Sequence, residues 1–397
     1  MKNYYKITPE GTRDYLFEEC TAINKVSRII TDVFRSKGYH EALTPGLEFF
    51  DAFTRGSSGI QQEDMYKLSD NKGRLLVLRP DLTVPIARMA APRLQKETRP
   101  IRLYYNQTVY RNNPALTGRS NEVRQAGIEL IGAGGKRADL EVIVTAVEAL
   151  QKIVPDFRIE LGHAGFFKSL AQQLPVSDIV REEIRLSIES KNYSALDTIL
   201  DGLEQTSTVA AIRRLPRLFG GEEILSEASE LFEGTQAQQA LCDLKELYHS
   251  LSHLCMGDRL IIDLGLVQRN DYYSDMVFSG YVEGSGDAVL IGGRYDKLFD
   301  TFDMPMPAAG FGINVDALSK ILLQKGAVEQ SKAPDVLVHA DDGYEMEAIS
   351  QSRFYTLSGL TCEYSVYTTR EEALSYARQR SITKVCFVNE EHETIDL

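Results

Sequence analysis

The chain has 397 residues, and its 57 acidic and 44 basic side chains leave a formal net charge of -13 at pH 7. This charge argues against a nucleic acid as the main partner, because phosphate backbones bind basic surfaces. Hydrophobic residues at 43% and charged residues at 25% are typical of a globular protein, and the length allows roughly two to three domains.

Residues 20–37 form the first periodic segment. Apolar side chains recur there at helical spacing, at Ile23, Val26, Ile30, Val33 and Phe34. Gly38 follows directly, so the pattern predicts an amphipathic helix that ends at a left-handed glycine. The next residues read GYHEALTPGLEFFD and place Thr44 before a proline, which favours an extended backbone.

Short strand patterns then follow one another over residues 74–79, 101–110 and 122–131. No long helix pattern separates them, and such close spacing indicates an antiparallel sheet. Apolar residues from Leu140 to Leu150 predict the next helix, which ends before a proline.

The middle of the chain differs in character, because helical patterns dominate residues 166–256 and strand patterns return only over 259–264, 274–281 and 288–291. This order predicts a helical insertion in a loop of a sheet that is completed afterwards. We therefore expect an α+β fold with a core over residues 1–328. A polar stretch separates it from residues 334–397, whose alternating strand and helix signals predict a small α/β domain.

The cysteines are odd in number and widely spaced, at Cys20, Cys242, Cys255, Cys362 and Cys386. This usage is typical of reduced cytosolic proteins, and we expect the thiols to be small buried apolar groups. The N-terminus has no apolar signal region, and no stretch approaches ~18 uninterrupted apolar residues. The sequence thus predicts a cytoplasmic protein without a membrane segment.

Four ordered segments of residues 9–318 resemble the histidyl-tRNA synthetase family: GYHEALTPGLE, LRPDLTVPIAR, VYRNNPALTGRSNEVRQAGIELIG, and the pair LVQRNDYY with GGRYDKL. Each match alone would be weak, but four in order are specific. The resemblance implies a class II aminoacyl-tRNA synthetase-like antiparallel sheet flanked by helices, with dimerisation through the first segment. Residues 334–397 resemble a shortened anticodon-binding domain.

The second and third segments carry candidate binding residues. Asp81 and Thr83 alternate along the chain, and the resemblance implies that this acid and hydroxyl hold a substrate ammonium group. A surface aspartate beside a turn threonine is the alternative. Gln125 and Glu129 share one strand face with Gly127, which would leave room for a ligand. The resemblance implies contacts from these two residues to the amino group and the imidazole of histidine.

Tyr272 and Tyr273 resemble the tyrosines that line an imidazole pocket, where a phenol can hydrogen-bond a ring nitrogen. Two core tyrosines are the alternative reading. Arg111 matches the arginine that grips the ATP α-phosphate in the synthetases. Without its partners this arginine would merely pair with an acid.

Departures from the synthetase pattern decide the expected function. Gln268 stands in place of the loop arginine, Ala317 in place of the last-motif arginine, and Asn113 in place of an acid of the ATP site. Attack of a carboxylate on a phosphate needs preorganised cations, and an amide cannot replace a guanidinium. Arg269 is one residue out of step, so on a strand it would point the other way.

A synthetase-like chain without these cations resembles the family of ATP phosphoribosyltransferase regulatory subunits. The resemblance implies a hetero-octamer of four such chains with four short catalytic subunits, in the first step of histidine biosynthesis. It implies no catalytic residue, cofactor or metal, and a histidine-sensing pocket of Asp81, Thr83, Arg111, Gln125, Glu129, Tyr272 and Tyr273. An active histidyl-tRNA synthetase with rearranged ATP-binding cations is the competing interpretation.

Two other functions have weaker sequence support. Asp341 and Asp342 follow a strand pattern, as in phosphoribosyltransferases, but no phosphate-cradling glycine run accompanies them. His249 and His253 share a helix face near Cys255, yet no fourth metal ligand is evident. We therefore interpret the aspartates as a solvated turn and the histidines as surface or core groups.

Overall fold

The computed structural model describes the whole chain except residues 1–2, 56–59, 115–117, 232–234, 268–271 and 329–331. Gln268 and Arg269 of the sequence argument therefore lie outside the described residues. The chain divides into two compact units, Met1–Ala327 and Val328–Leu397, which are described separately.

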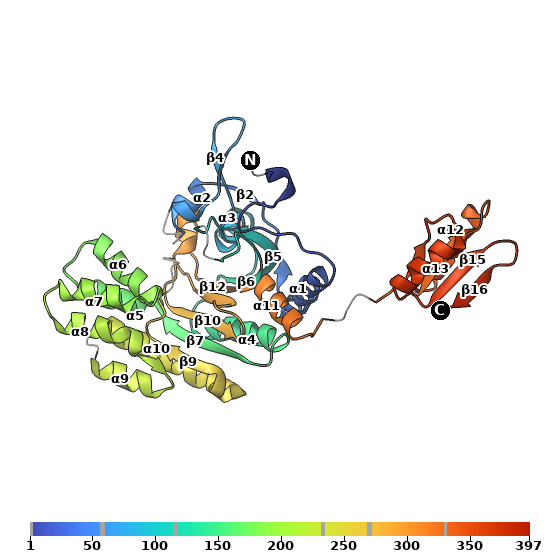
Figure 1. Ribbon diagram of the computed structural model, residues 1–397. Helices are drawn as coiled ribbons and strands as arrows, with labels where there is room; N and C mark the ends of the chain where they lie inside the picture. The colour runs from blue at the N-terminus through green and yellow to red at the C-terminus, as the bar shows by residue number, and fades with distance from the viewer. Residues whose placement is uncertain (1–2, 56–59, 115–117, 232–234, 268–271, 329–331) are drawn as a thin grey trace. The chain divides into compact units, whose positions relative to one another are not determined.

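A nine-stranded sheet forms the centre of the first unit (Figure 1). Its spatial order is β1 (His40–Glu41), β5 (Ile101–Tyr110), β6 (Glu122–Ile131), β12 (Ala308–Asn314), β11 (Leu290–Arg294), β10 (Met276–Val282), β7 (Phe157–His163), β9 (Leu260–Asp263) and β8 (Phe219–Gly220). All neighbours are antiparallel except the β1–β5 and β7–β9 pairs. The predicted antiparallel sheet is confirmed, and β5 and β6 have the predicted bounds.

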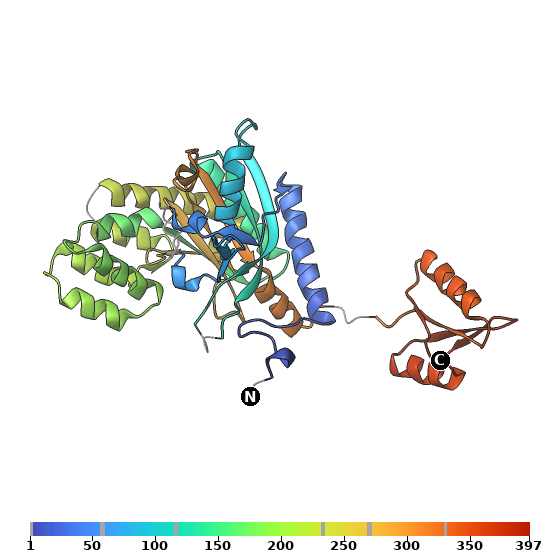
Figure 2. The same ribbon diagram turned by 90° about the horizontal axis from the view of Figure 1, so that it is seen from above.

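Three helices cover one face of this sheet: α1 (Glu18–Ser36), α4 (Lys136–Gln151) and α11 (Val315–Gln324). Figure 2 shows α1 and α11 side by side along it. The apolar stripe predicted for the first helix is buried in α1. Gly38 has φ +80°, so the predicted left-handed stop is confirmed.

The other face carries α3 (Thr83–Arg93) and the short helices α2 (Asp51–Thr54) and η6 (Leu298–Phe302), which share an apolar cluster with the sheet. A separate three-stranded sheet, in the order β2 (Leu47–Phe49), β4 (Leu75–Leu78) and β3 (Lys67–Ser69), adjoins them. Residues 74–79 thus form a strand as predicted, but in this small sheet rather than the large one. Single 3-10 turns occur at η1 (Tyr4–Lys6) and η2 (Gln62–Asp64).

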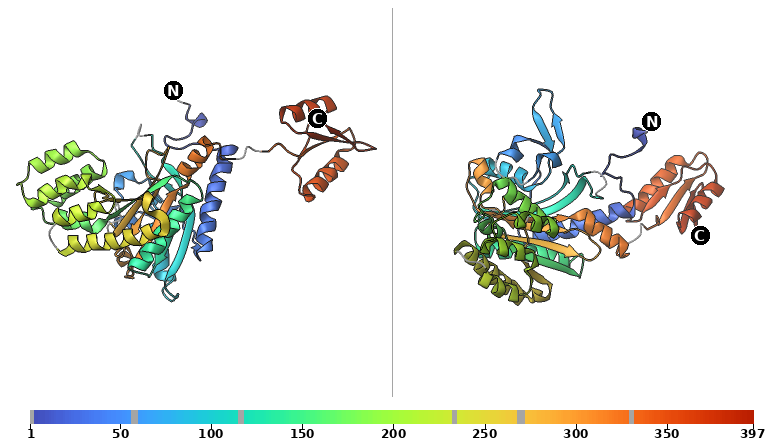
Figure 3. Two further views of the ribbon diagram at one scale, coloured as in Figure 1. Left: turned by 90° about the horizontal axis from the view of Figure 1, so that it is seen from below. Right: turned by 60° about the vertical axis from the view of Figure 1, so that its left-hand side comes forward.

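Between β7 and β9 the chain is mostly helical, and these helices appear green to yellow in Figure 3. They are α5 (Ala164–Ala171), α6 (Asp178–Glu189), α7 (Tyr193–Asp201), α8 (Ser207–Arg214), α9 (Glu223–Leu231) and α10 (Thr235–Leu251), with the short turns η3 (Leu215–Arg217), η4 (Ser252–Met256) and η5 (Gly257–Arg259). Side-chain caps at Ser177, Asn192 and Thr206 begin three of them, because these residues satisfy otherwise unpaired helix N–H groups.

The second unit contains one four-stranded sheet in the order β14 (Cys362–Tyr364), β13 (Val336–Ala340), β15 (Lys384–Val388) and β16 (Glu393–Asp396). Helices α12 (Glu345–Leu357) and α13 (Arg370–Gln379) pack against it. Small apolar clusters form its core, one with Ala373 and Ala377 and the other with Ala348.

The expectation that the cysteines are buried needs correction. Of the four cysteines described, Cys386 is buried, but Cys20 and Cys242 are exposed and Cys362 is half-buried. The sequence patterns also do not predict β12 as a strand, because its glycines weaken the usual strand signal.

Among the described residues, no helix combines the length and apolar character needed to cross a membrane.

Candidate functional site

Asp81 lies in the turn between β4 and α3, where its side chain is buried. The backbone N–H of Val84 donates to Asp81 Oδ1 at 3.3 Å. The second oxygen, Oδ2, is buried with no hydrogen-bond partner among the described residues. Burial raises the pKa of Asp81 to about 7, because a carboxylate loses its hydration there. This site therefore holds an acceptor that a cationic group could satisfy.

Glu129 projects from β6 and is only 1% exposed. The hydroxyl of Thr83, the first residue of α3, donates to Glu129 Oε1 at 2.8 Å. The phenol of Tyr295 donates to the other carboxyl oxygen. Burial raises the pKa of Glu129 to about 8, although both hydrogen bonds act in the opposite direction. Asp81, Thr83 and Glu129 thus belong to one buried polar cluster.

The predicted tyrosines border this cluster. The ring centroids of Tyr272 and Tyr273 are 4.9 Å apart, and Tyr272 meets Tyr295 at 5.7 Å with an interplanar angle of 76°. Lys168 of α5 donates to the backbone carbonyl of Tyr273 at 2.8 Å, which ties the loop to the helical region. Burial raises the pKa of Tyr272 well above its ordinary value. The Tyr272 phenol therefore stays protonated and able to donate.

The structure corrects the expectation that Gly127 leaves room for a ligand. A Cβ atom added there would lie 2.0 Å from the carbonyl oxygen of Phe311 and 2.4 Å from the Tyr105 hydroxyl. Tyr105 is directly opposite Gly127 in the β5–β6 register and is buried. The glycine thus makes room for a tyrosine of its own sheet rather than for a ligand.

The two remaining predicted residues lie at the edge of the cluster. Gln125 shares the strand face of Glu129 but is about 13 Å away along β6, and its Oε1 is buried without a partner among the described residues. Arg111 follows β5, is exposed, and donates from Nε to the carbonyl of Pro80 at 3.3 Å. Its positive charge counteracts the rise in the pKa of Asp81. Arg111 therefore borders the cluster without an ion pair among the described residues.

Sequence reasoning missed Tyr105 and Tyr295, which also belong to the cluster: Tyr295 donates to Glu129 and Tyr105 packs over Gly127. The signal for Tyr105 was its place opposite a glycine in paired strands, where aromatic rings cover glycine. Tyr295 follows two glycines in the GGRYDKL segment. A Cβ atom at Gly293 would lie 2.7 Å from the Tyr273 ring, so that glycine makes room for the ring.

Two positions aligned with the synthetase ATP site, Asn113 and Ala317, carry neutral side chains, whereas Arg111 keeps its positive charge. Asn113 uses its amide on its own loop, donating to the carbonyl of Ser120 at 2.9 Å. Ala317 lies in the first turn of α11, where its N–H donates to the capping side chain of Asn314 at 3.0 Å. Neither residue offers a cation to a phosphate.

Arg294 of the GGRYDKL segment is a cation, but it is already paired. It is almost fully buried, and its Nε donates to Asp139 Oδ1 at 2.9 Å. Asp296 accepts a further hydrogen bond from its Nη1 at 3.0 Å. The arginine therefore joins β11 to α4, and its charge is neutralised.

Known proteins resemble this chain along nearly its whole length. A family model for histidyl-tRNA synthetase matches residues 11–318. The ATP phosphoribosyltransferase regulatory subunit of Clostridium acetobutylicum is 38% identical over 393 residues, which cover 97% of this chain and 96% of that protein. The protein of the same name from Bacillus mycoides is 36% identical, over 97% of this chain and 92% of its own. The chain belongs to the family of ATP phosphoribosyltransferase regulatory subunits.

Solved structures agree with this assignment. A Bacillus halodurans protein described as an ATP phosphoribosyltransferase regulatory subunit/histidyl-tRNA synthetase has a TM-score of 0.82 and 28% identity, covering 97% of this chain and 99% of its own. A histidyl-tRNA synthetase from Nostoc has a TM-score of 0.74 at 20% identity, covering 100% of this chain and 97% of its own. The second likeness shows the fold alone: the expected class II synthetase-like architecture is confirmed.

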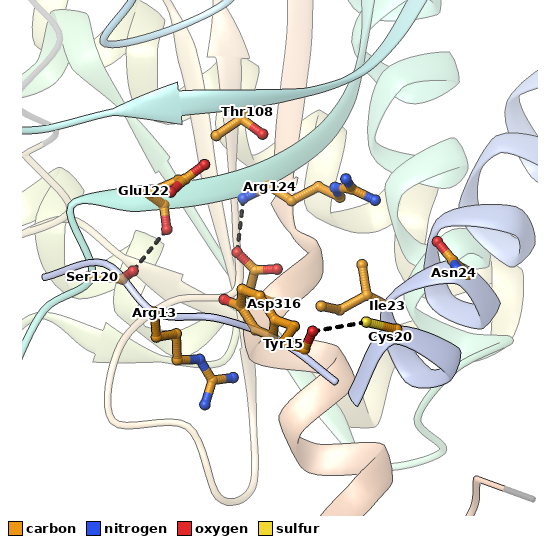
Figure 4. A pocket seen from close by; sticks show the side chains of 10 residues that line it. All are labelled: Arg13, Tyr15, Cys20, Ile23, Asn24, Thr108, Ser120, Glu122, Arg124 and Asp316. Atoms are coloured by element: carbon orange, nitrogen blue, oxygen red, sulfur yellow. Dashed lines mark hydrogen bonds between the residues drawn. The ribbon is translucent and has the colours of Figure 1, made fainter. Parts of the chain in front are cut away.

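A cavity of about 270 Å³ lies on the opposite face of β6 from Gln125 and Glu129. Figure 4 shows its lining from the N-terminal segment, α1, β6 and α11. Arg13, Arg124, Glu122 and Asp316 all line it, and the backbone N–H of Arg124 donates to Asp316 at 2.8 Å. Its charges balance within the wall, and the cavity is separate from the predicted pocket.

The weaker sequence candidates have structural partners. Arg370 donates from Nε to Asp341 at 2.8 Å, and this guanidinium lowers the pKa of Asp341. His249 Nε2 lies 3.0 Å from Glu222 Oε1. Across the part of the chain that the structure describes, no group of three or more His, Cys, Asp or Glu side chains could hold a metal ion.

Proposed function

We propose that this chain is a non-catalytic regulatory subunit that a short ATP phosphoribosyltransferase catalytic subunit requires for activity. In this proposal it also mediates feedback inhibition by histidine in the first step of histidine biosynthesis. The names of its relatives and its synthetase-like fold support this function. The retained pocket and the missing ATP cations support the division of roles.

The observation that carries the proposal is the buried acceptor Asp81 Oδ2, which has no hydrogen-bond partner among the described residues. Buried polar atoms are usually paired, and leaving one unpaired costs about 1 to 3 kcal/mol. An amino acid's ammonium group supplies the donors and charge that Asp81 lacks. Glu129 and the phenols of Tyr272, Tyr273 and Tyr295 provide hydrogen-bonding groups for an imidazole.

Linkage would connect this pocket to catalysis. A ligand inhibits at a distance only if it binds one state of the complex more tightly than another, with typical couplings of ~1 to 3 kcal/mol. Histidine contacts at Tyr273 would reach the helical region through Lys168, which donates to the Tyr273 backbone carbonyl. The regulatory chain need not touch the reacting atoms.

Reconstitution tests the proposal. The short catalytic subunit is assayed for ribosyl transfer alone, with this chain, and with this chain plus histidine. We expect activation by the chain and inhibition by histidine. The Asp81→Asn variant should still activate but respond less to histidine. Unchanged ribosyl transfer and an unchanged histidine response on adding the chain would refute the proposal.

The proposed assembly contains four regulatory and four catalytic chains, with regulatory chains dimerised through residues 38–48. Support comes from exposed apolar side chains at Leu43 and Leu47 and from Phe49 beside them. Exposed apolar clusters on a surface mark interaction sites. We place this complex in the cytoplasm, where free cysteines such as the four described here are common.

An active histidyl-tRNA synthetase remains the second candidate, because a family model of that enzyme matches residues 11–318. Histidine-dependent exchange of pyrophosphate into ATP separates the two functions. Exchange by the purified chain would favour the synthetase, and its absence together with activation of the catalytic subunit would favour the regulatory role.

A further inference from the structure

The cavity on the α1 side of β6 carries charges of both signs, and some of them are unpaired (Figure 4). Glu122 and Arg124 are two residues apart on β6, so both side chains belong to the cavity face of the strand. Their backbone atoms are hydrogen-bonded, but neither side chain makes a hydrogen bond or an ion pair within the described part of the chain. In Figure 4 the Arg124 side chain extends toward α1, away from Glu122.

The other two charged residues of the wall differ from each other. Arg13 is already engaged, because its Nη1 lies 3.2 Å from Glu19 Oε1 and its guanidinium lies 4.3 Å from the centroid of the Tyr15 ring. Asp316, in the first turn of α11, accepts a hydrogen bond only from the backbone N–H of Arg124, at 2.8 Å, as far as the described residues go. The unpaired charges of the wall are therefore one guanidinium and two carboxylates.

Two buried polar atoms without partners continue this wall between α1 and β5. The Oγ of Ser27, a residue only 7% exposed, and Asn106 Oδ1 have no hydrogen-bond partner in the described parts of the chain. Ser27 follows the cavity residues Ile23 and Asn24 by one helical turn and shares their side of α1. Asn106 precedes the cavity residue Thr108 by two positions and shares its face of β5. Such atoms are usually satisfied by a bound group.

We propose that this cavity binds a small zwitterion of the α-amino acid class. Its carboxylate would pair with Arg124, and its ammonium group with Glu122 and Asp316. Burial raises the pKa of Asp316, and the charge of Glu122 adds to this effect, so the two carboxylates lie close enough to share one cation. A simple anion would meet two carboxylates, and a simple cation would meet an unpaired guanidinium. Only a ligand with both charges satisfies both sides.

The size and position of the cavity agree with such a ligand. Its volume of about 270 Å³ is below the ~300 to 1,000 Å³ of pockets for drug-sized molecules. Ile23 and the ring of Tyr15 give it an apolar part for a ligand side chain. Because Glu129 points to the other face of β6, this site is separate from the cluster around Asp81.

An exposed cysteine in the wall provides the test. Cys20 lines the cavity, whereas Cys242 is exposed on α10 outside it. The full chain is alkylated with iodoacetamide in the presence of each common amino acid except cysteine, and both thiols are followed by mass spectrometry. At ten times its dissociation constant, at least one amino acid should slow alkylation of Cys20 about tenfold and leave Cys242 unchanged. Protection of neither thiol, or of both equally, would overturn the proposal.

Ligand analogues test the two charges on the unaltered chain. The amide of the protecting amino acid lacks the carboxylate, and the deaminated acid lacks the ammonium group. Each should require about a 10- to 100-fold higher concentration for the same protection of Cys20. Equal protection by the deaminated acid would show that the cavity takes a simple anion, and equal protection by the amide a simple cation. Either result would overturn the proposal.

Variants assign the charges to residues. Arg124→Gln and Glu122→Gln should each weaken protection by about 10- to 100-fold, while Arg28→Gln, on the exposed side of α1, should not change it. Undiminished protection in both cavity variants would contradict the proposal. Asp81→Asn should leave protection unchanged. If it abolishes protection, the effect arises at the histidine pocket, so this inference fails while the proposed function stands.

Failure of the proposed function would look different. In that case the chain would not change ribosyl transfer by the catalytic subunit, and Cys20 would still be protected by the amino acid.

Discussion

Two regions of the first unit, the cluster around Asp81 and Glu129 and the positions aligned with the synthetase ATP site, differ in what their polar groups do. In the cluster, both oxygens of Glu129 accept hydrogen bonds, whereas Asp81 Oδ2 has no partner among the described residues. At the ATP-aligned positions, Asn113 and Ala317 are neutral and bond to neighbouring loop or cap residues.

The contrast indicates that recognition and reaction depend on separable residues. A buried acceptor retained at a cost to stability is kept where a ligand can satisfy it. A cation that only a transition state needs has no such role once the reaction is lost. We therefore expect ligand binding to survive in one region and phosphate chemistry to be absent from the other.

The largest expected effect concerns adenylation. Each missing donor typically lowers turnover by about 10² to 10³, so the chain should exchange pyrophosphate about 10⁵-fold more slowly than a working synthetase if two losses add. The double variant Gln268→Arg/Ala317→Arg should raise histidine-dependent exchange, and the neutral Gln268→Leu/Ala317→Gln pair is its control. Rapid exchange by the unaltered chain would remove the contrast between the regions.

The next effect is on histidine affinity. Asp81→Asn removes the negative charge but keeps the size and the acceptor for Val84. Hydrogen bonds to charged groups contribute about 1.5 to 3 kcal/mol, so we expect about 10- to 100-fold weaker binding by calorimetry. Asp32→Asn, on the exposed side of α1, should leave affinity unchanged. Equal affinities for the two variants would show that the ammonium group does not bind at Asp81.

The change in histidine affinity with pH should be smaller than the effect of Asp81→Asn. Burial raises the pKa of Asp81 to about 7, so the free protein has a mostly neutral carboxyl at pH 6 and a mostly ionised one at pH 8. An ammonium ligand binds the ionised form, and affinity should therefore rise about tenfold between these values. The Asp81→Asn variant should keep only the titrations of the ligand and of Glu129, whose pKa burial raises to about 8. If the affinity of the unaltered protein falls as the pH rises, the ionised form of Asp81 does not bind the ammonium group.

The smallest effect is expected at the ATP-aligned end. Asn113→Ala removes side-chain hydrogen bonds to Ser120 and Asn121. Because the site is partly exposed, thermal unfolding should show a loss of about 1 kcal/mol or less. Histidine affinity should not change. A marked fall in affinity would show that Asn113 belongs to the pocket.

Local patterns in the sequence were sufficient for much of the fold. The apolar spacing of residues 20–37, the alternating strands at 101–110 and 122–131 and the stop at Gly38 have local causes in side-chain period and backbone freedom. The strand β12 was not predictable in this way. Its glycines leave room for Glu129 and Gln125 side chains from the neighbouring strand, so the reason for them lies across the sheet.

The sequence by itself also determined which charges are missing, because Ala317 and Asn113 are neutral in any conformation. Only the tertiary structure decided which polar groups remain unsatisfied. Tyr105 fills the space above Gly127, Tyr295 bonds Glu129, and Asp81 keeps one oxygen unpaired. Burial and pairing depend on residues far apart in the chain, and no local pattern contains that information.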